Sequence, residues 1–143
     1  IISEEEILYP YVQQPQVLMC MSQEGFEKNI ASLSAGGLLI WDTDLVQTRD
    51  LDPGCVAYHL PATRFAEKLG NKMMANIVML GFLSAVSELV RLDSLRQAVF
   101  SSVPAKTKEI NAKAFDRGRE YGEAIQKSRA KLDQNPENPP ETK

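Results

Sequence analysis

The sequence has few of the side chains that usually carry catalysis or bind metals. Its 143 residues include one histidine and two cysteines. Neither cysteine has a second cysteine or a histidine at metal-ligand spacing, and an iron–sulfur cluster normally needs four thiolates. Cys20 and Cys55 each lie in an apolar run, so we interpret both as small buried hydrophobic residues. Because no disulfide framework is present, a reducing cytoplasm is the expected location.

The usual ligand-binding and nucleophile motifs are also missing. The sequence contains no G-x-G-x-x-G, no Walker A loop and no G-x-S-x-G elbow. Gly36 and Gly37 lie between a predicted helix and the next strand, which is the place of a helix cap and not of a phosphate loop. His59 alternates with apolar neighbours on a predicted strand, with no serine or cysteine at nucleophile spacing, so a structural role is favoured. Asp42 and Asp44 follow a predicted strand, where a metal is conceivable but a capped loop is favoured.

Charge and hydrophobic runs exclude two further classes of partner. The net charge is −3 and the isoelectric point is near 5.2, so neither nucleic acid nor an anionic membrane is expected to bind. Polar residues interrupt the most hydrophobic stretch, 73–90, which predicts no membrane span. Three glutamates follow residues 1–3, so no signal peptide is expected. Residues 1–50 carry a net charge of −6 and residues 104–131 one of +4. The basic segment is either a solvated helix face or a surface for an acidic partner or an anionic cofactor tail.

The hydrophobic pattern predicts an α/β fold. Short apolar runs at residues 17–21, 38–41 and 55–60 predict strands, the first of them covered on both faces. A helix capped by Ser22 is predicted between the first two strands, which makes a parallel βαβ unit. The expected class is therefore a three-layer Rossmann-like α/β domain with a mostly parallel sheet, a long buried helix and a C-terminal helix.

The second half of the chain is predicted to be helical. After a short helix that stops at Gly70, a helix over residues 71–90 is apolar around nearly its whole circumference, so it lies in a core or under another chain. Gly81 and Ala85 give it a flat strip for close approach of another backbone. Asp93 is expected to cap the next helix, and a last helix spans about 107–131. Residues 132–143 are expected to form a disordered tail because they lack large apolar side chains beyond the first position.

Two asparagines in the long helix need an explanation. Asn76 interrupts the apolar pattern, and a buried amide without a partner costs about 1–3 kcal/mol. Asn71 lies near the start of the same helix. Each is either a satisfied structural amide or a residue that faces a subunit or a ligand. Together with Arg64, they are the candidate interface or ligand-facing residues, whereas no catalytic or metal-binding residue is assigned.

Three stretches of the chain resemble a known family. Residues 60–81, 36–42 and 109–118 are similar to the γ subunit, or γ domain, of 2-oxoacid:ferredoxin oxidoreductases of the pyruvate and ketoisovalerate type. The segment from Ala75 and Asn76 to Leu80 and Gly81 is the most specific part. The resemblance covers about residues 1–122. In the family a strand and a glycine-rich loop precede the segment that matches residue 1, so residues 1–131 are expected to represent about the C-terminal two-thirds of the family domain.

The resemblance implies a function that the chain performs with other subunits. The holoenzyme decarboxylates a 2-oxoacid on thiamine diphosphate, passes electrons through iron–sulfur clusters to ferredoxin, and forms an acyl-coenzyme A. The implied partners are the α, β and ferredoxin-like δ subunits, which hold the cofactors, while this chain binds none of them. The alternative is a free-standing α/β module that binds a nucleotide-like ligand. A purely structural oligomerisation domain is a third reading.

Overall fold

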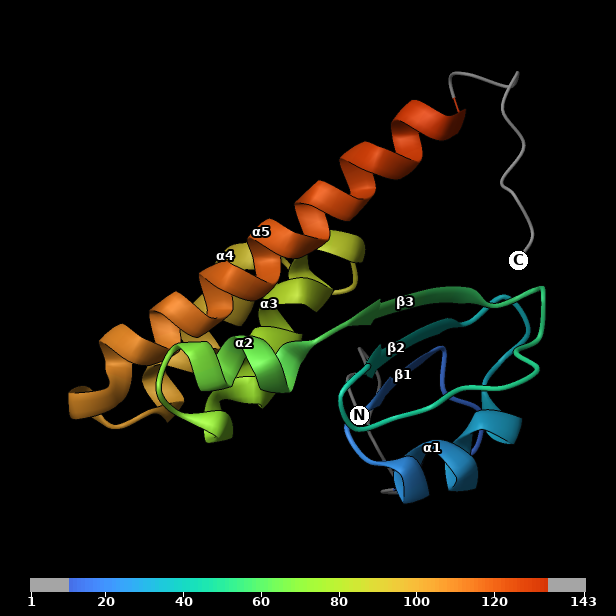
Figure 1. The fold of residues 1–143 in the computed structure, drawn as a ribbon, viewed down its shortest axis with the longest axis horizontal. Coiled ribbons are helices and arrows are strands. Elements are labelled where there is room, and N and C mark those ends of the chain that lie inside the picture. The colour runs from blue at the N-terminus through green and yellow to red at the C-terminus, as the bar shows by residue number, and fades with distance from the viewer. Residues whose placement is uncertain (1–10, 134–143) are drawn as a thin grey trace. The chain divides into compact units, whose positions relative to one another are not determined.

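The computed structural model of the protein describes residues 11–133. The chain forms two compact units, of which the first ends at Pro61 and the second begins at Ala62 (Figure 1). The first unit contains all the strands of the described residues, and the second contains only helices. Each unit is described by itself below.

The first unit is a parallel three-stranded sheet with one short helical layer. Its elements are β1 (Val17–Cys20), α1 (Gln23–Asn29), the 3₁₀ turn η1 (Ile30–Ser32), β2 (Leu38–Asp42) and β3 (Val56–Leu60). The strand order is β1-β2-β3, and both pairings are parallel. Residue 17 pairs with residue 38, and residue 38 pairs with residue 56. The predicted strands and the βαβ unit are therefore confirmed.

Local capping explains why α1 starts and where the chain turns into β2. Ser22 is extended, and its hydroxyl accepts a hydrogen bond from the Gly25 amide at 3.1 Å. Gly36 has a φ of +72°, a left-handed conformation that glycine adopts without steric cost. The predicted Ser22 cap is confirmed, whereas the predicted glycine cap is wrong: η1 ends at Ser32 with Leu33 as its C-cap, and Gly36 lies in the turn before β2.

The core of the first unit lies between the sheet and α1. It contains Cys20, Phe26, Leu39, Trp41 and Val46. In β1 only Cys20 is buried, whereas the other strand residues are half-buried. The expectation that this strand is covered on both faces is therefore wrong for most of its length.

The second unit is a helical bundle. Its elements are α2 (Ala62–Lys68), η2 (Lys72–Met74), α3 (Ala75–Val86), α4 (Leu92–Ser102), η3 (Ala105–Thr107) and α5 (Lys108–Asp133). The long α5 lies beside α3 (Figure 1). Fully buried side chains at this contact include Val78, Met79, Phe82, Ala114 and Phe115. The predicted buried helix and C-terminal helix are both present.

Glycine brings α3 and α5 unusually close together. A Cβ atom on Gly81 would overlap the Phe115 carbonyl oxygen, and one on Gly118 would overlap the carbonyl oxygen of Val78. A Cβ on Gly122 would lie 2.7 Å from that of Ala85. Glycine is needed where two backbones approach in this way. The flat strip predicted on α3 is thus covered by α5 of the same chain. Of the two alternatives for this face, burial in a core and cover by another chain, the structure shows burial in the core.

Several predicted helix boundaries are wrong. The helix expected over 71–90 begins as the turn η2 and α3 ends at Val86, because Ser87 is extended and its hydroxyl accepts from the Leu89 amide at 3.1 Å. Asp93 does not cap α4; Arg91 occupies the cap position and Asp93 lies in the first turn. The helix α5 continues to Asp133, two residues past the expected end. Residues 134–143 of the predicted tail lie outside the described residues.

Among residues 11–133, no helix is both long enough and apolar enough to cross a membrane. The longest helix, α5, is rich in charged residues along its whole length.

Candidate functional site

The buried carboxylate at the end of β2, that of Asp42, helps to hold the following turn. Asp42 is fully buried, and its side chain accepts a hydrogen bond from the Asp44 amide at 3.0 Å. Its carbonyl oxygen accepts from the amides of Leu45 and Val46 at 3.1 and 2.9 Å. These bonds close the turn that follows the strand. Within the described part of the chain, no group of three or more His, Cys, Asp or Glu side chains is placed to hold a metal.

The single imidazole packs against a tryptophan. His59 is exposed on β3 and pairs in register with Trp41 on β2. Their ring centroids are 5.2 Å apart with an interplanar angle of 44°. Trp41 itself is buried. His59 therefore covers one edge of the tryptophan, in agreement with the structural role expected from the sequence.

The two thiols differ in their surroundings. Cys20 is 3% exposed, and burial raises the pKa of its thiol above the ordinary value of 9.0. Cys55 is half-buried before β3, and both cysteines are free. A buried thiol with a raised pKa is a poor nucleophile because little of it is thiolate. Neither cysteine has the features of a reactive or cluster-binding residue.

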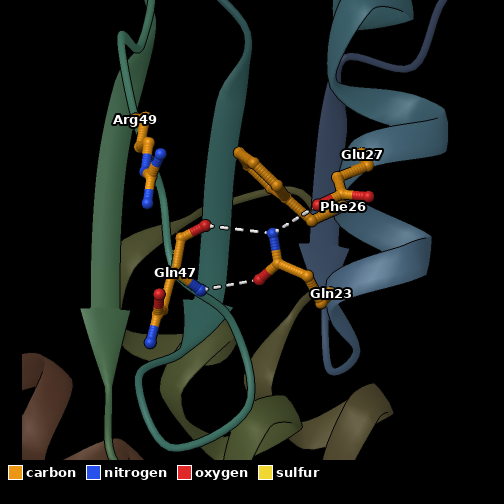
Figure 2. Close-up of a pocket in the computed structure, with 5 residues that line it drawn as sticks. All are labelled: Gln23, Phe26, Glu27, Gln47 and Arg49. Atoms are coloured by element: carbon orange, nitrogen blue, oxygen red, sulfur yellow. Dashed lines mark hydrogen bonds between the residues drawn. The ribbon is translucent and has the colours of Figure 1, made fainter.

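A cavity opens between α1 and the loop that follows β2. Its volume is about 450 Å³, and its walls are Gln23, Phe26, Glu27, Gln47 and Arg49 (Figure 2). The helix α1 follows the carboxyl end of β1, and the loop follows that of β2. This is the edge of a parallel sheet at which α/β folds place ligands.

Gln23 holds the two walls of this cavity together. Its amide nitrogen donates to the Gln47 carbonyl at 3.2 Å and to Glu27 Oε1 at 2.9 Å (Figure 2). Its oxygen accepts from the Gln47 amide at 2.8 Å. The side chain thus pairs with the loop backbone as a neighbouring strand would. Arg49 is exposed at the rim and brings a positive charge, but the lining includes no base positioned beside a nucleophile.

Sequence reasoning missed this cavity. Gln23 and Gln47 are 24 residues apart and belong to no motif. The only available signal was their position after two strands of a predicted parallel sheet.

The sequence-predicted interface residues lie at the start of the second unit. Asn71 is half-buried and caps η2, where its Oδ1 atom accepts from the Met73 amide at 3.0 Å. Asn76 is exposed on the first turn of α3, and its Oδ1 atom accepts from the Ile77 amide at 2.9 Å. The expectation that the Asn76 amide is buried in an all-apolar helix is therefore wrong. Arg64 is exposed on α2.

An exposed methionine accompanies these polar groups. Met73 is 78% exposed on η2, between the Asn71 cap and Asn76. Methionine is adaptable in packing and enriched at protein interfaces. The segment 71–76 therefore combines an exposed apolar side chain with amides fixed by the backbone. We call it the η2 surface.

Comparison with known proteins places the chain in a family. The family model described as pyruvate ferredoxin/flavodoxin oxidoreductase matches residues 1–121. The chain belongs to this family. The 2-oxoglutarate synthase subunit KorC of Methanocaldococcus jannaschii is 36% identical over 87% of the chain and 68% of its own length. The ketoisovalerate oxidoreductase subunit VorA of Methanothermobacter thermautotrophicus is 31% identical over 85% of the chain and 26% of its own length.

Solved structures agree in fold. The γ subunit of a keto/oxoacid ferredoxin oxidoreductase from Geobacter sulfurreducens has a TM-score of 0.69 and 35% identity, over 76% of this chain and 64% of its own. A 2-oxoglutarate:ferredoxin oxidoreductase chain from Magnetococcus marinus, solved with 2-oxoglutarate, coenzyme A and succinyl-CoA bound, has a TM-score of 0.67 over 76% of this chain and 20% of its own. At 22% identity, this second likeness shows the fold alone.

The sequence-based prediction of a γ-type family member is therefore confirmed. The chain spans about two-thirds of the length of the KorC relative and slightly less of the Geobacter γ subunit.

Proposed function

We propose that the chain acts as the non-catalytic γ subunit of a 2-oxoacid:ferredoxin oxidoreductase complex. The complex would decarboxylate a 2-oxoacid oxidatively, transfer the two electrons to ferredoxin, and release carbon dioxide and an acyl-coenzyme A. The family match over residues 1–121 carries this proposal. The identity of 35% to the γ subunit of a keto/oxoacid ferredoxin oxidoreductase from Geobacter sulfurreducens also supports it.

The described residues do not fit the cofactors of such a complex. An iron–sulfur cluster normally needs four thiolates, whereas the chain has two cysteines, of which Cys20 is buried in β1 and Cys55 is half-buried just before β3. No described carboxylate group is arranged for a divalent cation. We therefore assign thiamine diphosphate and the clusters to the α, β and ferredoxin-like δ subunits. Coenzyme A would likewise bind to the complex and not to this chain alone.

The η2 surface is the proposed contact with these partner subunits. Met73 contributes exposed apolar area, and burying such a side chain is worth about 1.5–3 kcal/mol. The exposed Asn76 amide offers donors to a partner while its Oδ1 atom is held by the backbone. Asn71 shapes the turn, and Arg64 on the preceding helix is the remaining candidate of the same interface.

The substrate class is a 2-oxoacid, and the γ chain is not expected to select which one. The named relatives act on 2-oxoglutarate and ketoisovalerate, and both are similar to this chain over more than four-fifths of its length. We propose that specificity resides in the subunits that carry thiamine diphosphate. The first substrate to assay is 2-oxoglutarate, since the KorC relative is the more similar of the two.

Assembly and turnover together test this function. The tagged full-length chain, purified from its native extract, should bring with it subunits that carry thiamine diphosphate and iron–sulfur clusters. The complex should reduce a viologen dye only when both a 2-oxoacid and coenzyme A are present. A chain that is monomeric in the extract and binds a nucleotide by itself would instead establish the alternative of a free-standing module.

A pair of variants tests the η2 surface. Met73→Ser and Asn76→Leu should each weaken assembly, while Leu89→Ser should not, because Leu89 is also exposed, at 56%, but lies outside this surface. Helical content measured by circular dichroism should be unchanged in all three. Normal assembly of both η2 variants would rule out the η2 surface as the contact and limit Asn76 to its hydrogen bond with the Ile77 amide.

A further inference from the structure

The C-terminal part of α5 continues past the helix against which α5 packs. The contacts of Gly81 with Phe115 and of Ala85 with Gly122 show that α3 and α5 run in the same direction. The helix α3 ends at Val86, so α5 beyond about residue 123 has passed its end. Every residue from 127 to 132 is exposed. A helix without packing on any side is marginal in water, so this segment is a place where a partner would add stability.

The side of α5 that faces α3 continues into the exposed segment. Positions 118, 121, 125, 128 and 132 follow the alternating spacing of three and four residues that keeps one seam facing a neighbouring helix. Gly118 is buried against α3, and the Tyr121 ring lies 6.2 Å from that of Phe82. Further along the same seam, Ile125 is half-buried and Leu132 is 66% exposed. The seam therefore extends beyond the α3 partner that the chain supplies.

Basic side chains flank the exposed part of the seam. When positions 125, 128 and 132 form the seam of a heptad repeat, Arg129 and Lys131 occupy the positions on either side of that seam. Lys127 lies nearby. Flanking charges select the partner of a helix seam. Two cations disfavour a second parallel copy of the same helix, because equal charges would then meet. The two apolar seam positions, Ile125 and Leu132, with cations beside them instead match a helix with its own apolar stripe and acidic flanks; the hydroxyl of Ser128 between them donates to the Ala124 carbonyl at 3.0 Å.

We propose that residues 124–133 of α5 dock onto an acidic helix of a catalytic subunit of the oxidoreductase. The inference rests on the proposed function and adds a second contact to it, separate in sequence from the η2 surface. Ile125 and Leu132 supply the apolar contacts, and Lys131 pairs with a carboxylate of the partner helix. The apolar seam favours a protein helix over the phosphates of coenzyme A, which would need only the charges.

Matched variants test this surface in the complete complex. The full-length chain and its variants are titrated onto the purified catalytic subunits, and the Kd is measured by biolayer interferometry. Leu132→Ser and Lys131→Glu should each raise the Kd about tenfold or more. The controls are Leu89→Ser, which also removes an exposed leucine, and Lys28→Glu, which like Lys131→Glu removes an exposed cation from the last turn of a helix. Both controls should bind like the wild type.

Salt dependence reports separately on the charges. Added salt should weaken the wild type more than the Lys131→Glu variant, because it screens an ion pair that the variant has lost. Circular dichroism should show the same helical content in the variants and their controls.

The possible outcomes separate this proposal from the proposed function. Wild-type binding that neither Leu132→Ser nor Lys131→Glu weakens would overturn the α5 contact and leave the γ-subunit function intact. A wild-type chain that binds no catalytic subunit would overturn both. Concentration-dependent self-association lost in Leu132→Ser would replace the acidic helix with a second copy. Saturable coenzyme A binding by the chain alone, lost in Lys131→Glu, would replace it with the cofactor.

Discussion

Replacing Gly118 with alanine should destabilise the helical unit, although alanine normally stabilises a helix. A Cβ at this position would lie 2.8 Å from the Val78 carbonyl carbon and 2.9 Å from the Phe82 backbone nitrogen, and it would overlap the Val78 carbonyl oxygen. Ordinary contact begins near 3.4 Å. The obstacles are backbone atoms that cannot rotate away. The two helices must therefore separate by about 0.5–1 Å, a gap that forfeits a quarter to a half of a dispersion contact.

The size of the effect follows from what the contact buries. Val78, Phe82 and Phe115 are fully buried at this contact, and each is worth about 1.5–3 kcal/mol when buried. Loosening all three by a quarter to a half costs about 1–4 kcal/mol. The higher helix propensity of alanine offsets about 1 kcal/mol of this loss in the free energy of unfolding. We expect Gly118→Ala to lower the free energy of unfolding by about 2 kcal/mol.

Urea unfolding of the chain, followed by circular dichroism at 222 nm, measures this change. Gly122→Ala should be milder, because its Cβ would meet the Ala85 Cβ at 2.7 Å and the nearest backbone atom at 3.2 Å. Ala124→Gly, at an exposed position of the same helix, should cost only about 1 kcal/mol through propensity. An unchanged or raised midpoint in Gly118→Ala would refute the close contact of α3 with α5.

Three further results are expected. Gln23→Ala removes two hydrogen bonds that join α1 to the loop after β2, and a third to Glu27 within α1. It should destabilise the sheet unit by about 1–2 kcal/mol and speed amide exchange in residues 43–55, and unaltered exchange would count against this role of Gln23. Iodoacetamide should label Cys55 before Cys20, because burial raises the pKa of the Cys20 thiol above 9.0, and equal labelling in mass spectrometry would contradict this order. The sheet unit should also lose stability as the pH rises past 9, because the Cys20 thiol then ionises in the unfolded chain but not in the folded one. Arg96→Ala removes a 2.7 Å salt bridge to Asp116 on α5 and the guanidinium 5.2 Å above the Phe100 ring. Because the ion pair is about 40% exposed, the free energy of unfolding should fall by only about 1 kcal/mol, and a Tm equal to that of the wild type would show that the pair contributes nothing.

Local signals in the sequence predicted most of the first unit. The apolar runs at 17–21, 38–41 and 55–60 and the Ser22 cap place the parallel strands and α1 correctly, because strand period and capping are properties of neighbouring residues. The burial of β1 was predicted wrongly. How much of a strand is covered depends on its place in the sheet, which its own sequence does not encode.

In the second unit, the errors come from competition between local bonds and from tertiary contacts. Ser87 ends α3 early by bonding to the Leu89 amide, although the apolar pattern continues. Asn76 looks buried from its neighbours, yet it lies on the exposed side of the first turn of α3. The apolar pattern of α3 did not show whether α3 is covered by its own chain or by another. The answer depends on Gly118 and Gly122 of α5, which lie more than thirty residues further along the chain.

The candidate sites were predicted less well than the fold. The expectation that the chain carries no catalytic residue rests on its single histidine and two cysteines and stays a prediction. The cavity beside Gln23 depends on side-chain bonds across 24 residues and carries no motif. The extension of α5 beyond α3 became visible only when both helix ends were known.

Reconstitution of turnover tests the central claim most directly. The catalytic subunits, prepared without this chain, are assayed for viologen reduction with a 2-oxoacid and coenzyme A, and the purified chain is then added back in equal amount. The γ-subunit function predicts that the chain alone reduces no dye and that its addition restores coenzyme A-dependent turnover of the catalytic subunits. Full turnover by the catalytic subunits in the absence of the chain, unchanged on adding it, would contradict the account.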